Sequence, residues 1–213
     1  MNVFDAITTR KNILKFKKDP VDDKLIGVML YMATHAHSAG DMQEWNFLVV
    51  RDETRKKKLY EAALEHPILR TAPIIIVIFA NLENAGTRYQ KRGEVFYSIQ
   101  DTASATMVME IVANALGLGT VWIGSFDEER VKNILFVPDK LRPVAILAVG
   151  HPAESEDRKE RIPFDNLTWN NTYGKKYEFS YLLQPGPRKE LDIKPLGNMI
   201  EDAIKRLRKD SKK

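Results

Sequence analysis

The chain has 213 residues, 44% of them hydrophobic and 29% charged, with a formal net charge of +4 and no Cys. This length suits one domain, or one domain with appendages, and the composition is that of a globular protein. The absence of Cys excludes disulfides, thiolate nucleophiles, Cys-based zinc sites and iron–sulfur clusters, and it fits a reducing cytoplasm, where we expect this protein.

We expect neither a membrane segment nor a nucleic-acid partner. Charged residues such as Asp5 and Arg10 interrupt the N-terminus before an apolar stretch forms, which argues against a signal peptide. The longest apolar helix candidate carries Asp101 and Glu110, so it does not resemble a membrane span. Residues 205–213 hold six basic residues and one acid, or +5, which leaves −1 of the +4 for the rest. We interpret them as a solvated tail; nucleic-acid binding is an alternative that rests on this tail alone.

The first half of the chain predicts two helices and two buried strands. Apolar residues at helical spacing behind Asp22, a candidate N-cap, predict the first helix. Short apolar runs rich in β-branched residues predict the strands, and a polar stretch after them predicts a surface loop. In chain order these elements are the helix 22–36, the strand 45–50 (WNFLVV), the helix 53–65, the strand 73–80 (PIIIVIFA) and the loop 81–93.

The second half begins with a long helix that is apolar nearly all round, as expected for a helix buried in a domain or in an oligomer interface. Alternating helices and strands then predict a layered α/β or α+β domain around a central sheet. The elements expected here are the helix 94–116, the strand 120–123 (TVWI), a helix from Asp127 to Leu135, the strand 143–150 (PVAILAVG), an extended arm over 152–195 and an amphipathic helix from Leu196 to Leu207.

Single residues carry little chemical information in this chain. A phosphate loop of the G-x-x-x-x-G-K-[ST] type and a G-x-S-x-G elbow are both missing, and Gly117 and Gly119 supply only G-x-G after a helix. We interpret three residues, His35, His37 and Asp41, as polar residues at a helix end. A metal site is the weaker interpretation, since no further cluster of His or carboxylate residues completes it.

Four short segments suit either a ligand site or an ordinary surface. Basic residues near the first helix can grip a phosphate or remain solvated, and the same holds for a basic pair in the arm. A polar loop before the first strand can present backbone N–H groups to a ligand, and a Gly after the third strand can let a flat ligand approach the backbone. These segments are Arg10-Lys11-Asn12, residues 38–45 (SAGDMQEW), Trp122-Ile123-Gly124-Ser125 and Lys159 with Arg161.

The order of these segments resembles the nitroreductase-like, FMN-dependent oxidoreductase family. TTRKNILKF (8–16) is similar to the opening basic motif of that family, and AHSAGDMQEWNFLVV (36–50) is similar to its A-P-S-A-G-N-x-Q-P-W-x-F-x-V-V segment. ANALGLGTVWIGSF (113–126), VPDKLRPVAILAVGHPAE (137–154) and KERIP (159–163) resemble the later signatures. The resemblance covers about residues 1–175, so we expect a family domain there and a C-terminal extension with an amphipathic helix over 176–213.

The resemblance implies an α+β three-layer sandwich with a central mixed sheet and helices on both faces. It also implies a homodimer with two FMN sites at the subunit interface, where the long helix would lie. The residues that it places at FMN are Arg10, Lys11, Asn12, Lys159 and Arg161 at the phosphate, Ser38, Ala39, Asp41 and Gln43 in a loop from the partner subunit, and Ile123 and Gly124 beside the isoalloxazine ring.

The activity that the resemblance implies is hydride transfer from NADH or NADPH through flavin N5 to nitroaromatic, quinone or related acceptors, with ping-pong kinetics. The flavin carries the chemistry, so no catalytic acid or base and no metal are expected. Three departures from the family pattern are Leu14 for a basic residue, Asp41 for Asn and Glu44 for Pro. They leave open a flavin-binding or sensing protein without turnover, or a specialised flavin-destroying or dehalogenating member.

Overall fold

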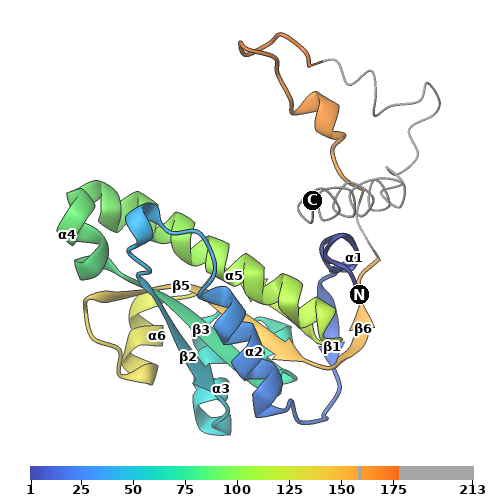
Figure 1. Cartoon of the computed structure of the whole chain (residues 1–213). Coiled ribbons are helices and arrows are strands. Elements are labelled where there is room, and N and C mark those ends of the chain that lie inside the picture. The colour runs from blue at the N-terminus through green and yellow to red at the C-terminus, as the bar shows by residue number, and fades with distance from the viewer. Residues whose placement is uncertain (158–159, 178–213) are drawn as a thin grey trace, which may run out of the picture. The chain divides into compact units, whose positions relative to one another are not determined.

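The structure is a computed structural model that describes residues 1–157 and 160–177, and it divides the chain into two units (Figure 1). The first unit is Met1–Asp157 and the second is Arg158–Lys213. In the second unit, the described part holds a short 3₁₀ helix, η4 (Phe164–Asn166), and an antiparallel bridge between Trp169 and Lys176. The expected helix from Leu196 lies outside the described residues.

The core of the first unit is a four-stranded antiparallel sheet with the strand order β2-β3-β5-β4. Its central strand β3 is an uninterrupted apolar run in which Ile76 pairs with Leu147 of β5, as expected for a strand covered on both faces. The four strands are β2 (Trp45–Val50), β3 (Ile74–Asn81), β4 (Gly119–Ile123) and β5 (Leu141–Gly150).

Two short strands form a separate antiparallel pair beside this sheet. They are β1 (Ile13–Phe16) and β6 (Pro152–Ser155), so the predicted arm begins with a strand. Just before β1, Asn12 makes an isolated parallel bridge to Thr120 of β4. All strand pairs within the main sheet itself are antiparallel. The bridge brings the α1–β1 connection next to the start of β4.

Helices cover both faces of the sheet, which confirms the predicted α+β sandwich (Figure 1). On one face, Ile76 packs in a cluster with Met29 of α2 and Met109 of α5. On the other face, Val77 packs in a cluster with Leu59 of α3. The covering helices are α2 (Asp23–Ala33) and α5 (Ser98–Ala115) on the first face, and α3 (Glu53–Ala62) and α6 (Glu128–Leu135) on the second.

The polar stretch predicted as a loop over 81–93 is instead the helix α4 (Leu82–Arg92), so that prediction was wrong. Asn81 caps this helix by accepting a hydrogen bond from the N–H of Asn84 at 3.0 Å. Only Ala85 is buried, so the helix lacks the apolar stripe from which the sequence would predict it. A π-helical turn, η3 (Gly93–Tyr97), joins α4 to α5, so the long helix predicted from residue 94 becomes α-helical at Ser98.

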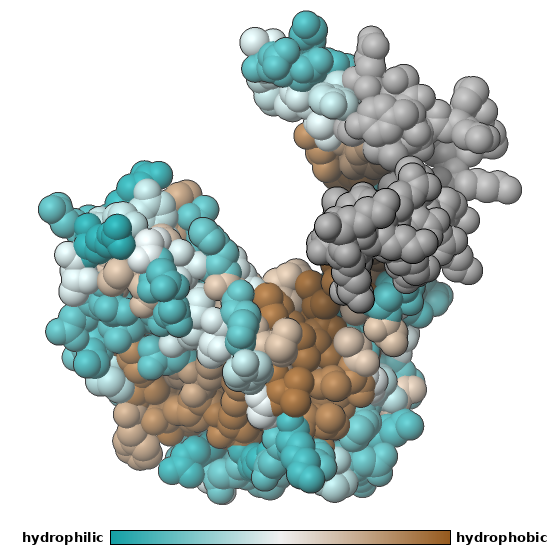
Figure 2. Space-filling model, viewed as in Figure 1, coloured by the Kyte–Doolittle hydropathy of each residue, from teal (hydrophilic) through white to brown (hydrophobic). Residues whose placement is uncertain are grey.

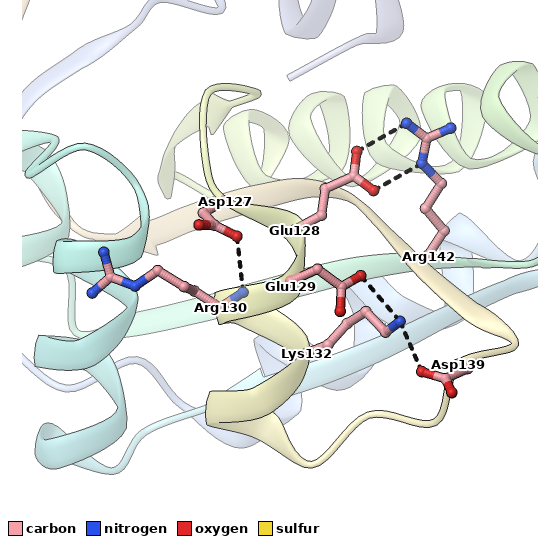
Figure 3. Close-up of polar contacts among 7 residues, drawn as sticks. All are labelled: Asp127, Glu128, Glu129, Arg130, Lys132, Asp139 and Arg142. Carbon is pink, nitrogen blue, oxygen red and sulfur yellow. Dashed lines mark hydrogen bonds and ion pairs between the residues drawn. The ribbon is translucent and has the colours of Figure 1, made fainter.

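Helix α6 begins at the predicted cap, and charged pairs tie it to the following strand (Figure 3). The side chain of Asp127 accepts the N–H of Arg130 at 3.0 Å. Glu128 accepts two hydrogen bonds from Arg142 of β5, at 2.8 and 3.0 Å. Both side chains of this pair are more than 40% exposed, so it contributes at most about 1 kcal/mol.

Candidate functional site

A cavity of about 230 Å³ lies where the end of α1 (Val3–Thr9) meets the start of β4. Its lining residues include the basic residues Arg10 and Lys11, residues of α5 and of the α5–β4 connection, and apolar residues such as Ile13, and the surface of the lining is mostly apolar. The lining residues that the argument uses are Thr9, Arg10, Lys11, Asn114, Gly119 and Thr120. The structure therefore brings two of the predicted phosphate ligands to one concave site.

Arg10 is held from behind by a buried carboxylate. Its Nη1 lies 3.5 Å from Oε1 of Glu110, and the Arg10 side chain is 21% exposed. The same Oε1 accepts a hydrogen bond from Oγ1 of Thr120 at 3.1 Å. Burial raises the pKa of Glu110, and the Arg10 guanidinium and the Thr120 hydroxyl act in the opposite direction.

A second residue of α5 fixes the end of α1. Nδ2 of Asn114 donates to the carbonyl of Ala6 at 2.8 Å and to Oγ1 of Thr9 at 2.9 Å. Glu110 and Asn114 are four residues apart, so they share one face of the helix. This face positions the α1–β1 connection, and with it Arg10.

The other residues predicted at the FMN phosphate and beside the isoalloxazine ring in the first unit lie along the edge strand β4. Lys11 and Asn12 are exposed, and Asn12 is the residue bridged to Thr120. Ile123 ends β4 and is buried, and Gly124 follows it at the surface. From Thr120 to Gly124 the chain advances four residues, or about 13 Å along a strand. A Cβ on Gly124 would have only Nε1 of Trp122 near it, at 3.9 Å, so the backbone there is open to a ligand.

The predicted loop over residues 38–43 is a tight turn with a strained backbone. Gly40, Asp41 and Gln43 have φ values of +57°, +60° and +49°. Oγ of Ser38 accepts the N–H of Gln43 at 3.2 Å, and Nε2 of Gln43 donates to Oδ1 of Asp41 at 2.8 Å. Ser38 is buried, whereas Asp41 and Gln43 are exposed. The loop thus presents polar groups on a fixed backbone.

Two neighbouring helices hold this loop through three hydrogen bonds. The N–H of Ala39 donates to Oδ2 of Asp101 on α5 at 2.7 Å. From α4, Nη1 of Arg88 donates to the carbonyl of Gly40 at 3.0 Å, and Nδ2 of Asn84 donates to the carbonyl of Met42 at 2.9 Å. A polar helix that the sequence did not predict therefore supports the loop.

A second buried carboxyl group adjoins the loop. Glu44 is 2% exposed, and its Oε2 has no hydrogen-bond partner. Burial raises the pKa of Glu44, and the neighbouring Asp101 carboxylate, itself 3% exposed, raises it further. Both the burial of Glu44 and its carboxyl neighbour therefore favour the protonated form of Glu44 over the ionised form.

The loop and the cavity lie at different positions along α5. Asp101 holds the loop and Glu110 holds Arg10, and nine residues of helix correspond to about 13 Å. Among the described residues that line the cavity, none belongs to the loop over 38–43. Within one chain, the structure does not unite these two groups of predicted residues.

The remaining predicted phosphate ligands belong to the second unit. Lys159 lies outside the described residues, and Arg161 is exposed. Their role at a phosphate stays a prediction. Over residues 1–157 and 160–177, no group of three or more His, Asp or Glu side chains is arranged to hold a metal ion, and no helix is long and apolar enough to cross a membrane.

Sequence reasoning missed Glu110, Thr120 and Asn114 as parts of the site. The available signal was the presence of charged and amide residues in an otherwise apolar helix. That pattern shows that polar side chains are buried, and it does not show what they contact. Contacts between residue 110 and residues 10 and 120 become visible only in the folded chain.

An apolar surface covers the side of the first unit that carries α1, α2 and α5. Figure 2 shows brown surface gathered over the region of α2 and α5. An apolar patch of this kind is typical of an interaction surface. The exposed hydrophobic residues of these three helices are Val3 and Ile7 on α1, Val28, Tyr31 and Met32 on α2, and Met107 on α5.

The structure is thus an α+β sandwich with a cavity, lined in part by Arg10 and Lys11, at the start of the edge strand β4. A family model described as the nitroreductase family matches residues 7–68 and 63–151. The chain belongs to this family.

Named relatives agree with this membership. An NADH dehydrogenase from Thermus thermophilus is 32% identical over 196 residues, which is 78% of this chain and 95% of the relative. The structure of NfrA1 nitroreductase from B. subtilis is 26% identical with a TM-score of 0.73, covering 81% of this chain and 75% of that one. An NADPH:FMN oxidoreductase from Vibrio harveyi, complexed with NAD+, is 20% identical with a TM-score of 0.75 over 82% of this chain and 79% of that one, and it shares the fold.

Proposed function

We propose that this protein is an FMN-dependent NAD(P)H oxidoreductase that reduces nitroaromatic, quinone or related acceptors. The observation that carries the proposal is the cavity in which Arg10 and Lys11 meet the start of β4, with Gly124 open at the other end of the same strand. Family membership and the names of the relatives supply the activity and its cofactor.

The residues present fit the phosphate end of FMN. Arg10 offers a planar set of N–H donors that suits phosphate oxygens, and Lys11 adds a second positive charge. The cavity of about 230 Å³ has room for a phosphate group, and Asn114 and Thr120 are among its lining residues. Toward the ring end, the lack of a side chain on Gly124 leaves the backbone accessible to a flat ligand.

FMN, when bound, supplies the chemistry by accepting a hydride from NAD(P)H and passing electrons to the acceptor. The chain would bind the phosphate through Arg10, Lys11 and Asn12 and would keep the ring against Ile123 and Gly124. Its backbone at Gly124 is available as a hydrogen-bond donor near the ring. Because the flavin carries the chemistry, no side chain of the protein is assigned the role of catalytic acid or base.

We further propose that the active form is a homodimer in which the loop over 38–43 of one subunit completes the site of the other. The separation of this loop from the cavity within one chain supports this arrangement. The apolar surface of α1, α2 and α5, with Met107 of α5 42% exposed, supplies a surface for the contact. In such a dimer Ser38, Ala39, Asp41 and Gln43 would meet the flavin of the partner subunit.

Steady-state kinetics tests the activity. Protein loaded with FMN and desalted is mixed with NADH or NADPH and a quinone or nitroaromatic acceptor, and oxidation is followed by absorbance. We expect continuous turnover and parallel double-reciprocal lines, as in a ping-pong reaction. Retention of FMN without turnover would support the flavin-sensing alternative, which Leu14, Asp41 and Glu44 suggest. Products derived from the flavin itself, or dehalogenated products, would indicate the specialised alternative.

The cellular setting is also a proposal. We place the protein in the cytoplasm because a chain without Cys suits a reducing compartment. A small-molecule acceptor, NAD(P)H and a second copy of the chain are its proposed partners. Removal of residues 196–213 tests the alternative of nucleic-acid binding, and a truncation that loses no binding would remove the support for that alternative.

A further inference from the structure

The phosphate end of the proposed site has an unusual neighbour, because a buried carboxyl group stands directly behind its principal cation. Arg10 and Thr120 line the cavity, and Glu110 touches both of them without belonging to the lining. The Glu110 side chain is only 4% exposed, and Arg10 approaches it to 3.5 Å. Any anion that binds Arg10 from the cavity therefore competes with a carboxylate on the other side.

We propose that Glu110 couples proton uptake to the binding of the flavin phosphate at Arg10. FMN then binds together with a proton, whereas riboflavin, which lacks the phosphate, binds without one. This inference rests on the proposed function, because it requires that the cavity holds the phosphate of FMN. Glu110 acts here as a positioning residue, since it reaches the phosphate only through Arg10.

Arg10 is the charged group that stabilises the ionised form of Glu110, so an anion that binds Arg10 favours protonation of Glu110. The end of α1 contributes Arg10, the one charged group that acts on the carboxylate in the described structure. Strand β4 contributes the hydroxyl of Thr120, and α2, β3 and β5 face α5 with apolar residues such as Met29, Ile76 and Leu147. Just before β2, Glu44 neighbours Asp101, which lies nine residues before Glu110 on α5.

A bound phosphate makes the ionised form of Glu110 less stable. A phosphate group carries a charge of about −1.5 to −2 near neutral pH, and it would share the guanidinium that stabilises the Glu110 carboxylate. The second negative charge makes ionisation of Glu110 less favourable, so the pKa of Glu110 rises when the phosphate binds. Burial has already raised the pKa of Glu110 above the ordinary carboxyl value. The proton comes from solvent and remains on Glu110 while the phosphate stays bound.

The test compares FMN with riboflavin, which has the same ring and lacks the phosphate. Dissociation constants are measured by flavin fluorescence for wild type and Glu110→Gln between about pH 5.5 and 8.5, a range around the second phosphate ionisation near about 6. Glu128→Gln is the matched control, because Glu128 also pairs with an arginine and is exposed. That phosphate ionisation affects all three proteins alike, so it cancels in the ratio of their constants.

We expect the ratio of the FMN dissociation constants, wild type over Glu110→Gln, to rise with pH. The rise is about tenfold for each unit by which the phosphate raises the pKa of Glu110. The riboflavin ratio stays constant with pH, and Glu128→Gln follows wild type. An FMN ratio that does not change with pH overturns the inference and leaves the proposed function intact. Failure to bind FMN at any pH overturns both.

Calorimetry on the unmodified protein keeps the inference testable if Glu110→Gln does not fold. Titrations at about pH 7, in buffers with different ionisation enthalpies, report the protons taken up with each ligand. We expect net proton uptake with FMN and none with riboflavin. Equal proton exchange for the two flavins would overturn the inference.

Discussion

Replacing Glu44 by Gln should stabilise the protein at alkaline pH and not at acidic pH. Glu44 is 2% exposed, one of its oxygens has no hydrogen-bond partner, and Asp101 is its charged neighbour. These surroundings raise the pKa of Glu44 in the folded chain, whereas the unfolded chain keeps the ordinary value. The folded state therefore binds more protons than the unfolded state above the ordinary carboxyl pKa, and stability falls as pH rises through that window.

The size of the effect follows from the linkage between pKa and stability. Each unit by which folding raises the pKa of Glu44 removes about 1.4 kcal/mol of stability once the pH exceeds the folded-state value. For a chain of this length, each kcal/mol corresponds to roughly 2–4 °C in Tm. Glu44→Gln has no such loss, so its Tm relative to wild type should increase from about pH 4.5 to about pH 8, by roughly 3–6 °C for each unit by which folding raises the pKa of Glu44.

Thermal unfolding followed by circular dichroism at these two pH values provides the measurement. Glu128→Gln is the control, since it removes a surface ion pair worth about 0–1 kcal/mol. We expect the control to be no more stable than wild type at either pH. A Tm difference between Glu44→Gln and wild type that is the same at both pH values would refute the reasoning.

Three further predictions concern the cofactor, the loop and the dimer. Arg10→Ala should weaken FMN binding roughly tenfold to a hundredfold, the value of a charge-assisted contact, whereas Arg130→Ala should not; equal dissociation constants by fluorescence titration would contradict the site. Gly40→Ala should lower Tm, because φ is +57° and an L residue there costs about 1–2 kcal/mol; an unchanged melting curve would argue against this backbone. Met107→Glu should yield monomers in light scattering, whereas Phe136→Glu at the exposed residue just after α6 should not; a dimeric Met107→Glu protein would place the interface elsewhere.

Local patterns predicted the elements whose burial is regular. The apolar run of β3 appears where the sequence expects a strand, and Asp22 and Asp127 cap the helices that they were expected to begin. Helix α4 was missed because a helix that buries only Ala85 has no apolar periodicity to detect. Its role in supporting the loop through Arg88 depends on tertiary contact.

The site was predictable to the extent that its residues are close in sequence. Arg10 and Lys11 line one cavity, and the role at a phosphate that the opening motif implies for them stays a prediction. The carboxylate behind Arg10 comes from a residue one hundred positions later, and no local pattern pairs Arg10 with Glu110. The loop over 38–43 was expected to act on the partner subunit, and its distance from the cavity along α5 is a property that only the folded chain reveals.

The most direct test of the account is a visible absorption spectrum of the purified protein after addition of FMN and desalting, followed by NADH or NADPH in the absence of oxygen. The account predicts a flavin band that is retained with the protein and is bleached by at least one of the two nucleotides. A protein that is colourless after desalting would contradict the account, and so would a retained band that neither nucleotide bleaches.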